Sequence, residues 1–508
     1  MGNAAVNAPL AESQAHSVST NRPRLSVESQ QTNTKRILFV TSEFADLVKV
    51  GGLGDVSAAL PRALHAFHDI RVLLPGYPQV LNSGHEVRVI AALPGHAALP
   101  PCRIGRLDLP DGLTLYVVIC PELYEREGTP YGDDRGRDWD DNHIRFARLG
   151  LAAAQIAAGE LNWIPELVHA NDWQSALAPA YMHWRGMVTP CIFTVHNLAY
   201  QGLCELASYK ELGLPDVVAQ ADGMEFYGQL CALKAGLIYA NHITTVSHNY
   251  ALEITTPEFG YGLEGVLNAR KREGRLTGIT NGIDASWQPH SDPLLERGFT
   301  GSDWQARAEN TRYVERLFGI EPGGPLFAVV SRLVYQKGID LTLQVADELV
   351  AAGGRLVVLG RGEEGLEQAL LDLARRHPGR VGVHIGFNEG DARRIFAGSD
   401  FLLMPSRYEP CGLSQMYAQR YGSLPIARRT GGLADTIEDG VTGFLFTEQT
   451  PSSYLSAIER ALNVYAHPEL REAMCSKAMA APMFWSESVL PYERLYRSLI
   501  SEPIEARD

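Results

Sequence analysis

FLLMPSRYEPCGLSQMYAQRYGSLPIARRTGGLAD, residues 401–435, is the stretch that decides the fold. It contains two short apolar runs, 401–404 and 424–427, and each is followed by a polar loop and a helical pattern. Short apolar runs of this kind are typical of buried strands in a parallel sheet, where a helix follows each strand. Ligands of such sheets bind where strands end and helices begin. The stretch therefore predicts an α/β domain with a binding site at two adjacent strand ends.

The loops that follow these two strands carry the groups of that site. Glu409 lies in the first loop, just before Gly412, and the second loop carries Arg428, Arg429 and the pair Gly431-Gly432. Backbone N–H groups at the start of a helix favour an anion. A carboxylate beside an anion site indicates a substrate with hydroxyls at one end and phosphate at the other.

The same alternation of strands and helices extends over most of the chain. It predicts a first group of strands, an irregular Gly- and charge-rich region at 268–284, and a second group of strands. Strands that alternate with helices indicate a parallel sheet with helices on both faces. We therefore predict an α/β protein with two Rossmann-like, doubly wound domains that face each other across a cleft. The predicted strands are 36–41, 70–74, 115–119, 167–170, 191–195 and 243–246, then 326–331, 355–359, 381–385, 401–404 and 424–427.

Four segments follow from this organisation. Residues 1–35 are rich in Ser, Asn, Gln and Ala and are predicted to be a disordered extension. Residues 36–277 form the first domain and residues 278–485 the second. The tail 486–508 contains an amphipathic helix at 486–500.

Composition excludes several classes of protein. The 508 residues carry 45 basic and 59 acidic side chains, a net charge of −14, which argues against a nucleic-acid surface. No apolar run is long enough to cross a membrane. The seven cysteines lack the C-x-x-C spacing of a zinc site and fit a reducing cytosol. We expect a cytoplasmic protein; the alternative is a plastid transit peptide in the Ser-rich start.

Two further loops at strand ends carry cations. KVGGLGD, residues 49–55, places Lys49 and the turn Gly51-Gly52 after the first strand. A tight turn with a solvated lysine is an equally good interpretation of that motif alone. SRLVYQKGID, residues 331–340, places Arg332 and Lys337 after the first strand of the second domain, where the two cations suit a diphosphate. The alternative is two surface charges in a loop.

The loop after the strand 401–404 carries a carboxylate, Glu409, that has two interpretations. Glu409 either hydrogen-bonds sugar hydroxyls or forms a salt bridge with Arg407. Pro410 and Gly412 fix a tight turn, which favours a positioned carboxylate. Because no histidine lies close in sequence, we interpret Cys411 as a packing residue of this turn rather than a nucleophile. The helix that follows opens with backbone N–H groups directed at the substrate, those of Gly412, Leu413 and Ser414.

Two polar residues end strands in the first domain. His196 follows the strand 191–195, at the same edge as the other motifs, and we favour a ligand contact over a purely structural role. Asp172 ends the preceding strand, and a helix N-cap is a nearly equal alternative for it.

Taken together, the motifs KVGGLGD, TVHN, TNGID, SRLVYQKGID and PSRYEPCGLSQMYAQRYGSLPIARRTGGLADT closely resemble bacterial glycogen synthases and plant starch synthases. The resemblance covers residues 36–500, with the motifs in the family's order. It implies a GT-B type glycosyltransferase fold and transfer of glucose from ADP-glucose to the non-reducing end of an α-1,4-glucan, with retention of configuration. It also implies that no metal and no cofactor take part, and that the tail helix returns to the first domain.

The resemblance further implies a role for each matching residue. Arg332 and Lys337 neutralise the diphosphate as ADP leaves, and Glu409 binds the donor glucose and supports an oxocarbenium-like transition state. His196 and Asn281 contact the glucose, and Asp172 lies near the donor or acceptor sugar. The remaining residues of the implied ADP-glucose site are Lys49, Gly51, Gly52, Phe387, Cys411, Gly412, Leu413, Ser414, Gly431 and Gly432.

The chain departs from the family pattern at two places within the matching region. Phe387 stands where we expect the tyrosine that stacks on adenine, so a hydroxyl contact is lost. Ser247-His248-Asn249 replaces Ser-Pro-Thr after the strand 243–246.

Two other functions remain open. A related glycosyltransferase that uses UDP-glucose is the nearest alternative, and a catalytically silent glucan-binding protein is the second. The retained set Lys49, Arg332, Lys337 and Glu409 argues against the silent protein. A nicotinamide oxidoreductase is disfavoured because the G-x-G-x-x-G motif is missing.

Overall fold

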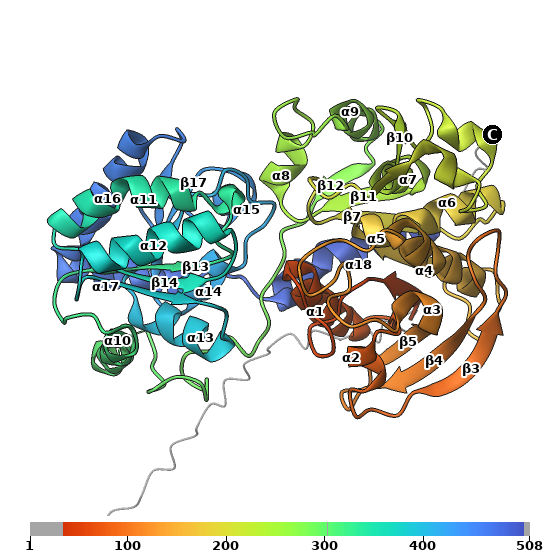
Figure 1. Ribbon diagram of the computed structural model, residues 1–508. Helices are drawn as coiled ribbons and strands as arrows, with labels where there is room; N and C mark the ends of the chain where they lie inside the picture. The colour runs from red at the N-terminus through yellow and green to blue at the C-terminus, as the bar shows by residue number, and fades with distance from the viewer. Residues whose placement is uncertain (1–33, 302, 502–508) are drawn as a thin grey trace, which may run out of the picture. The chain divides into compact units, whose positions relative to one another are not determined.

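The computed structural model describes residues 34–301 and 303–501 (Figure 1). The predicted extension 1–35 lies almost wholly outside the described residues, as does the end of the segment 486–508. We call residues 35–278 the N-terminal half and residues 304–480 the C-terminal half.

The N-terminal half is built on a nine-stranded sheet within the described residues. Seven of its strands are parallel, and two strands at one edge are antiparallel. In spatial order the strands are β12 (Leu276–Gly278), β11 (His242–Thr245), β7 (Cys191–Val195), β6 (Leu167–Asn171), β1 (Arg36–Val40), β2 (Asp69–Pro75), β5 (Thr114–Ile119), β4 (Cys102–Asp108) and β3 (Arg88–Leu93).

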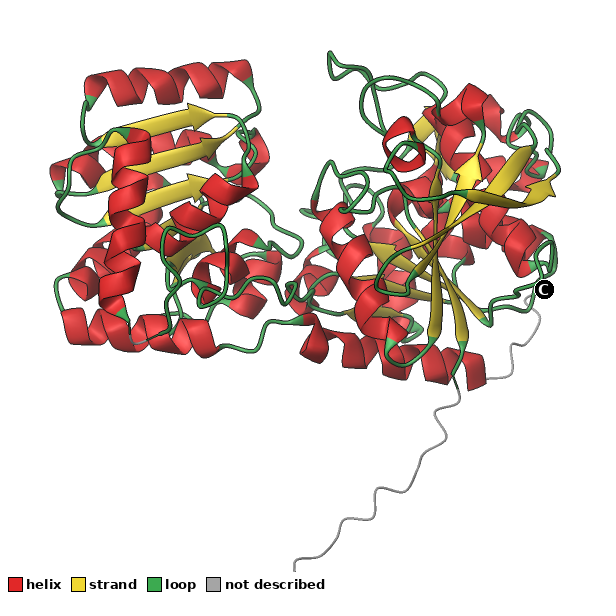
Figure 2. Cartoon of the chain, turned by 90° about the horizontal axis from the view of Figure 1, so that it is seen from below, coloured by secondary structure: helices red, strands yellow, loops and turns green. Residues whose placement is uncertain are grey.

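The C-terminal half has a wholly parallel sheet, so the two predicted strand-to-helix junctions of residues 401–435 are confirmed. The strands have continuous apolar sequences because helices cover both faces of the sheet, as Figure 2 shows. In spatial order they are β15 (Val381–Ile385), β14 (Arg355–Gly360), β13 (Leu326–Val330), β16 (Phe401–Met404), β17 (Leu424–Arg428) and β18 (Phe444–Phe446).

A small antiparallel sheet sits among the N-terminal helices. Its strands are β8 (Leu203–Glu205), β10 (Gln229–Cys231) and β9 (Glu225–Phe226). Short 3-10 turns, η1 (Leu206–Tyr209) and η2 (Asp216–Ala219), follow β8, and η3 (Tyr335–Lys337) follows β13.

Helices connect the strands in both halves. In the N-terminal half they are α1 (Gly52–His65), α2 (Pro78–Leu81), α3 (Pro121–Tyr124), α4 (Asn142–Ala157), α5 (Asp172–Ser175), α6 (Leu177–Trp184), α7 (Ala232–Tyr239), α8 (His248–Glu253) and α9 (Glu264–Arg272). In the C-terminal half they are α10 (Trp304–Phe318), α11 (Ile339–Ala351), α12 (Glu364–Arg376), α13 (Glu389–Gly398), α14 (Ser414–Arg420), α15 (Gly431–Thr436), α16 (Pro451–Tyr465) and α17 (Pro468–Ala480).

The structure corrects the expected strand set in the N-terminal half. The antiparallel strands β3 and β4 and the small sheet were not among the predicted strands. The sequence of β3, RVIAAL, does contain a short apolar run, which the prediction overlooked, and most of that run is exposed. The predicted boundary between domains at 277/278 falls within β12, which pairs with β11.

Two segments that connect the halves run side by side. Ile283 N–H donates to the carbonyl of Met483 at 2.8 Å, and Trp485 N–H donates back to the carbonyl of Ile283 at 3.3 Å. Gly282 permits this approach, because a Cβ at that position would lie 2.5 Å from the nitrogen of Trp485. The glycine of the TNGID motif is therefore required by chain packing.

The last described helix, α18 (Trp485–Ser501), packs against the first sheet. Its fully buried Tyr496 hydroxyl is hydrogen-bonded to His169 Nδ1 at 2.6 Å, and His169 Nε2 is bonded to the Thr194 hydroxyl at 2.6 Å. Burial lowers the pKa of His169 to about 3, so the ring is neutral. Figure 1 places α18 beside α1. None of the helices in the described part of the chain is both long and apolar enough to span a membrane.

The bond between Tyr496 and His169 predicts a measurable loss of stability in Tyr496→Phe. The change leaves His169 Nδ1 buried without a partner, and we expect the free energy of unfolding to fall by about 1–3 kcal/mol. Urea denaturation measures it. Tyr227→Phe is the control, because Tyr227 is 82% exposed, and we expect it to leave stability unchanged. Equal stability of the wild type and Tyr496→Phe would contradict a stabilising bond.

Candidate active site

An ion pair lies at the edge of the second sheet where β13 and β16 end. Lys337 Nζ is 2.5 Å from Glu409 Oε2, and the Ser406 hydroxyl donates to the same oxygen at 3.0 Å. Glu409 is only 5% exposed. Two residues that are 72 positions apart in sequence thus form one charge pair, in which the carboxylate is buried and the lysine is half-buried.

The alternative salt bridge between Glu409 and Arg407 is wrong. Arg407 instead pairs with Asp340, at 2.7 Å between Nη2 and Oδ2, and lies over the ring of Tyr335. Glu409 is therefore a positioned carboxylate rather than the partner of its neighbour.

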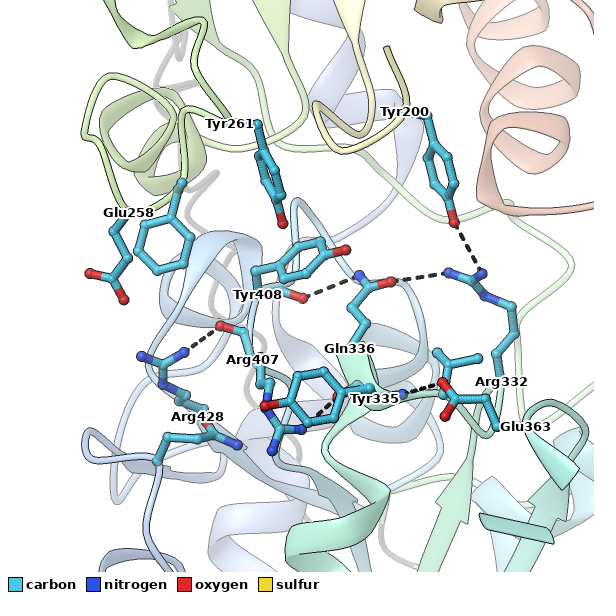
Figure 3. Close-up of a pocket in the computed structure, with 13 residues that line it drawn as sticks. Tyr200, Glu258, Tyr261, Arg332, Tyr335, Gln336, Glu363, Arg407, Tyr408 and Arg428 are labelled. Atoms are coloured by element: carbon cyan, nitrogen blue, oxygen red, sulfur yellow. Dashed lines mark hydrogen bonds between the residues drawn. The ribbon is translucent and has the colours of Figure 1, made fainter. Parts of the chain in front are cut away.

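Arg332 extends from the same edge but has no carboxylate partner among the described residues. Its guanidinium donates to the Tyr200 hydroxyl at 3.4 Å and to Gln336 Oε1 at 3.2 Å (Figure 3). Arg332 is exposed, so its charge is available to an anionic ligand. The loop after β13 therefore carries two cations, Arg332 and Lys337. Of the two, only Lys337 forms an ion pair with another described residue.

An open cavity of about 630 Å³ adjoins Arg332, and Figure 3 shows its lining. Residues of both halves contribute to it, and several are aromatic. Tyr200 and Tyr261 come from the N-terminal half, and Tyr335 and Tyr408 from the C-terminal half. The rings of Tyr261 and Tyr408 pack edge to face at 5.9 Å. Tyrosine rings of this kind offer both an apolar face and a hydroxyl to a sugar.

The start of α14 provides backbone donors beside Glu409. Gly412 has φ of +72°, which turns the chain into the helix. Within the described residues the N–H groups of Gly412, Leu413 and Ser414 donate to no other group of the chain, and all three residues are half-buried. These groups are available to an anion.

The N–H groups at the start of α15, unlike those at the start of α14, are already hydrogen-bonded among the described residues. The N–H of Gly431 donates to Glu253 Oε1 at 2.9 Å, and that of Gly432 donates to the carbonyl of Glu409 at 3.0 Å. Both N–H groups are therefore already bonded within the described chain, and a role of these two glycines at the diphosphate stays a prediction. A Cβ on Gly431 would lie 1.9 Å from the Glu409 carbonyl oxygen, so the pair is required by the close packing of the two loops.

The KVGGLGD loop is held by a residue that the sequence analysis missed. Glu43 is buried, and its Oε2 accepts from the N–H groups of Val50 at 2.7 Å and Gly51 at 2.9 Å. Its other oxygen is hydrogen-bonded to the Tyr131 hydroxyl, and burial raises its pKa. Glu43 lies three residues after β1, and that place at a strand end is the signal that marks it.

Lys49 itself pairs with a residue of its own motif. Its Nζ lies 2.7 Å from Asp55 Oδ1. Gly52 begins α1, and none of the other atoms in the described residues that surround this turn lies within 4 Å of a Cβ placed on Gly51 or Gly52. The surface over these glycines is therefore open to a ligand.

Asp172 and His196 are brought together at the ends of β6 and β7. The His196 N–H donates to Asp172 Oδ1 at 2.7 Å, and His196 Nε2 is bonded to Asn171 Oδ1 at 3.0 Å. Asp172 is not an N-cap, because it is the first residue of α5 and makes no capping bond. Its φ is +54°, an uncommon conformation for this residue. Burial raises the pKa of Asp172 to about 7 and lowers that of His196 to about 3.

Three further predicted residues are Asn281, Cys411 and Phe387. Asn281 is buried, and its side-chain Oδ1 has no hydrogen-bond partner in the described chain. Burial raises the pKa of Cys411 to about 12, which agrees with a packing role. Phe387, between β15 and α13, is 71% exposed. The described residues contain no group of three or more His, Cys, Asp or Glu side chains placed to hold a metal.

Two known domain families and several known proteins are similar to this chain. Residues 36–269 match the starch synthase catalytic domain, and residues 316–480 match the glycosyl transferases group 1 domain. The glycogen synthase of Pseudomonas syringae pv. syringae is 64% identical over 477 residues, which are 93% of this chain and 98% of that protein. The glycogen synthase of Pseudomonas aeruginosa is 66% identical over 468 residues, 92% of this chain and 91% of that protein.

The chain belongs to the glycogen synthase family. It is a glycosyltransferase with the GT-B fold. The structure of the catalytic domain of starch synthase IV from Arabidopsis thaliana, bound to ADP and acarbose, has a TM-score of 0.82 with 30% identity, and covers 92% of this chain and 100% of that one. Sucrose-phosphate synthase from Thermosynechococcus elongatus, with a TM-score of 0.57 and 17% identity over 92% of this chain and 99% of that one, shares the fold.

Because Asp172 is buried, we predict that it makes the free energy of unfolding of this glycogen synthase family member depend on pH. Its pKa in the folded protein, about 7, lies above the unfolded value, so the carboxyl favours folding at low pH and that contribution is lost as the pH rises toward 7. Asp172→Asn removes the ionisation and keeps an oxygen that accepts from His196. Relative to the wild type, we expect the variant to gain on the order of 2 kcal/mol of stability between pH 5 and pH 8.

Urea denaturation at the two pH values measures this gain. Glu348→Gln is the matched control, because Glu348 is an exposed carboxylate on α11. A difference between Asp172→Asn and the wild type that is the same at pH 5 and pH 8 would mean that Asp172 does not titrate in this range.

Proposed function

We propose that the chain transfers glucose from ADP-glucose to the non-reducing end of an α-1,4-glucan, with retention of configuration and release of ADP. The observation that carries the proposal is the pair of Lys337 and Glu409, with the unpaired Arg332 on the same loop and the open N–H groups at the start of α14. The two cations and the N–H groups suit a diphosphate, and the Glu409 carboxylate suits sugar hydroxyls. The relatives are named as glycogen synthases, and a related structure contains ADP and acarbose.

Binding of the donor redistributes the charges of the site. The diphosphate binds Arg332, Lys337 and the N–H groups of Gly412–Ser414, and Lys337 leaves Glu409. The Glu409 carboxylate then accepts hydrogen bonds from the glucose hydroxyls in its place. A buried carboxylate that loses its partner is unstable, so sugar and diphosphate are bound together.

Charge stabilisation accounts for the chemical step. The bond between C1 and the phosphate oxygen breaks, and the departing ADP carries negative charge that the two cations and the helix N–H groups stabilise. Glu409 stabilises the positive charge on the glucose ring. The acceptor hydroxyl attacks from the face on which ADP leaves, and a phosphate oxygen takes its proton. This route needs no metal ion and no cofactor.

The remaining residues surround the two substrates. Phe387 provides an exposed ring for adenine, and Asn281 has an unpartnered oxygen for a sugar hydroxyl. His196 and Asp172 lie on the sugar side. Lys49, Gly51 and Gly52 face the donor from the N-terminal half. The tyrosine-lined cavity beside Arg332 suits the acceptor glucan.

The location of the protein is a separate proposal. We propose that the protein is cytoplasmic, which is supported by the seven cysteines being free of disulfides. Cell fractionation tests it, and recovery of the protein from a membrane or periplasmic fraction would contradict it.

The donor is tested by glucose incorporation into glycogen from labelled ADP-glucose and UDP-glucose, measured side by side. We expect the higher kcat/KM with ADP-glucose. A preference for UDP-glucose would contradict the donor assignment, and incorporation from neither donor would leave the chain as a silent glucan-binding protein. A chelator is expected to leave the rate unchanged, because no step uses a metal.

The role of Lys337 is tested by Lys337→Ala. The change removes a cation that stabilises the leaving group, and it also leaves Glu409 buried without its partner. We expect kcat to fall by about 100-fold or more. Lys271→Ala, at an exposed lysine of α9, is the control and is expected to leave kcat unchanged. Normal turnover in Lys337→Ala would overturn the assignment.

A further inference from the structure

The loop that carries Glu409 is held from outside its own sheet. Ser247, at the start of α8 in the N-terminal half, donates its hydroxyl to the carbonyl of Pro410 at 2.5 Å. Asn249 N–H donates to Asp435 Oδ2 at 3.0 Å. The start of helix α8 is therefore bound both to the loop that carries Glu409 and to helix α15.

Glu253, the last residue of α8, makes the most extensive of these contacts. Its Oε1 accepts from the Thr430 hydroxyl at 2.9 Å and from the Gly431 N–H at 2.9 Å. It also accepts from the Asn249 side chain at 2.9 Å, which fixes the carboxylate on its own helix. The second oxygen, Oε2, is buried without a hydrogen-bond partner in the described chain, and the charged group that faces the carboxylate is Arg428.

The segment that Glu253 holds lies directly on the backbone of Glu409. The N–H of Gly432 donates to the carbonyls of Glu409 at 3.0 Å and Pro410 at 3.2 Å. The packing leaves no space for side chains, since a Cβ on Gly432 would lie 2.1 Å from the Cys411 carbonyl oxygen. A displacement of Gly431 and Gly432 would therefore displace Glu409.

We infer that Glu253 is a positioning residue for the transfer reaction: by binding Thr430 and Gly431 it fixes Gly432, and through Gly432 it fixes the backbone of Glu409. Glu253 itself touches neither substrate. The inference rests on the proposed role of Glu409. It assigns to α8, an element of the N-terminal half, control over the geometry of a carboxylate in the C-terminal half.

The position of a reacting group affects the transition state more than it affects the binding of the nucleotide. We therefore expect Glu253→Ala to lower kcat by about 10- to 100-fold. The affinity for ADP should fall by a much smaller factor than kcat, because Arg332 and Lys337 are untouched and only the N–H groups of Gly412–Ser414 share the displaced loop. Glu253→Gln keeps an oxygen that accepts from Gly431 and Thr430, and it should recover most of the lost kcat. Thr430→Val, which removes one donor to Glu253, should lower kcat less than Glu253→Ala.

The experiment measures kcat, the KM for ADP-glucose and the dissociation constant for ADP in these variants, in Glu409→Gln, and in the double variant E253A/E409Q. If Glu253 acts through Glu409, the double variant is no more than about twofold slower than Glu409→Gln alone. Glu160→Ala, at an exposed glutamate that follows α4, is the control and should be unchanged. Thermal unfolding of each variant separates a loss of fold from a loss of geometry.

The outcomes distinguish the inference from the proposed function. Full activity of Glu409→Gln would overturn the role of Glu409, and with it the basis of this inference. Impaired Glu409→Gln with normal Glu253→Ala would overturn the inference alone. Independent, multiplying effects of the two substitutions, or equal losses of kcat and ADP affinity in Glu253→Ala, would also overturn it.

Discussion

The ion pair between Lys337 and Glu409 is the interaction on which the site depends. Without a ligand, each group neutralises the other at 2.5 Å. A buried carboxylate without a partner is costly, so the pair keeps the empty site stable. In the function that we propose, a ligand that binds Lys337 alone would leave Glu409 unpaired. The proposed mechanism therefore makes the pair a means of selecting a substrate that contains both a diphosphate and a sugar.

The backbone around this pair explains why the motifs are so long. The Glu409 loop contacts the start of α15 through carbonyl and N–H groups, and Ser247 binds the same loop from α8. Gly431 and Gly432 are needed because any side chain there would collide with Glu409 or Cys411. The two glycines and the carboxylate therefore form one packed unit, although they belong to the exit loops of two different strands.

The sequence was sufficient for most of the parallel core, although the three-residue strands β12 and β18 were not predicted, and it was insufficient for the exposed parts. Strands such as β13 and β14 are short apolar runs because both their faces are buried, and a run of that kind is recognisable without a structure. Strand β3 has the apolar sequence RVIAAL but is exposed over most of its length, so its composition does not reveal that it lies at the antiparallel edge of the sheet. The small sheet of β8–β10 escaped prediction because its strands have only two or three residues.

The sequence predicted which residues lie at the strand ends of the site, but not which of them pair with one another. The positions of Arg332, Lys337 and Glu409 follow from the sheet edge, whereas the pairing of Lys337 with Glu409 across 72 residues depends on the order of β13 and β16 in space. Gly431 and Gly432 seemed suited to phosphate because sequence cannot tell whether an N–H is already bonded. Glu253 was missed because it binds residues 177 and 178 positions further along the chain, whereas Glu43 lies only seven and eight residues before the N–H groups that it binds and could have been found from its place at a strand end.

The return of α18 to the first sheet has a consequence for how the protein folds during synthesis. The bond between His169 and Tyr496 spans 327 residues, so the core around β6 and β7 lacks its covering helix until these residues have been synthesised. At about 5–20 residues per second this delay is on the order of tens of seconds. The C-terminal half, whose sheet is built from one continuous segment, has all its strands as soon as residue 446 has left the ribosome. The part of the chain that is made first is thus the part whose core is completed last.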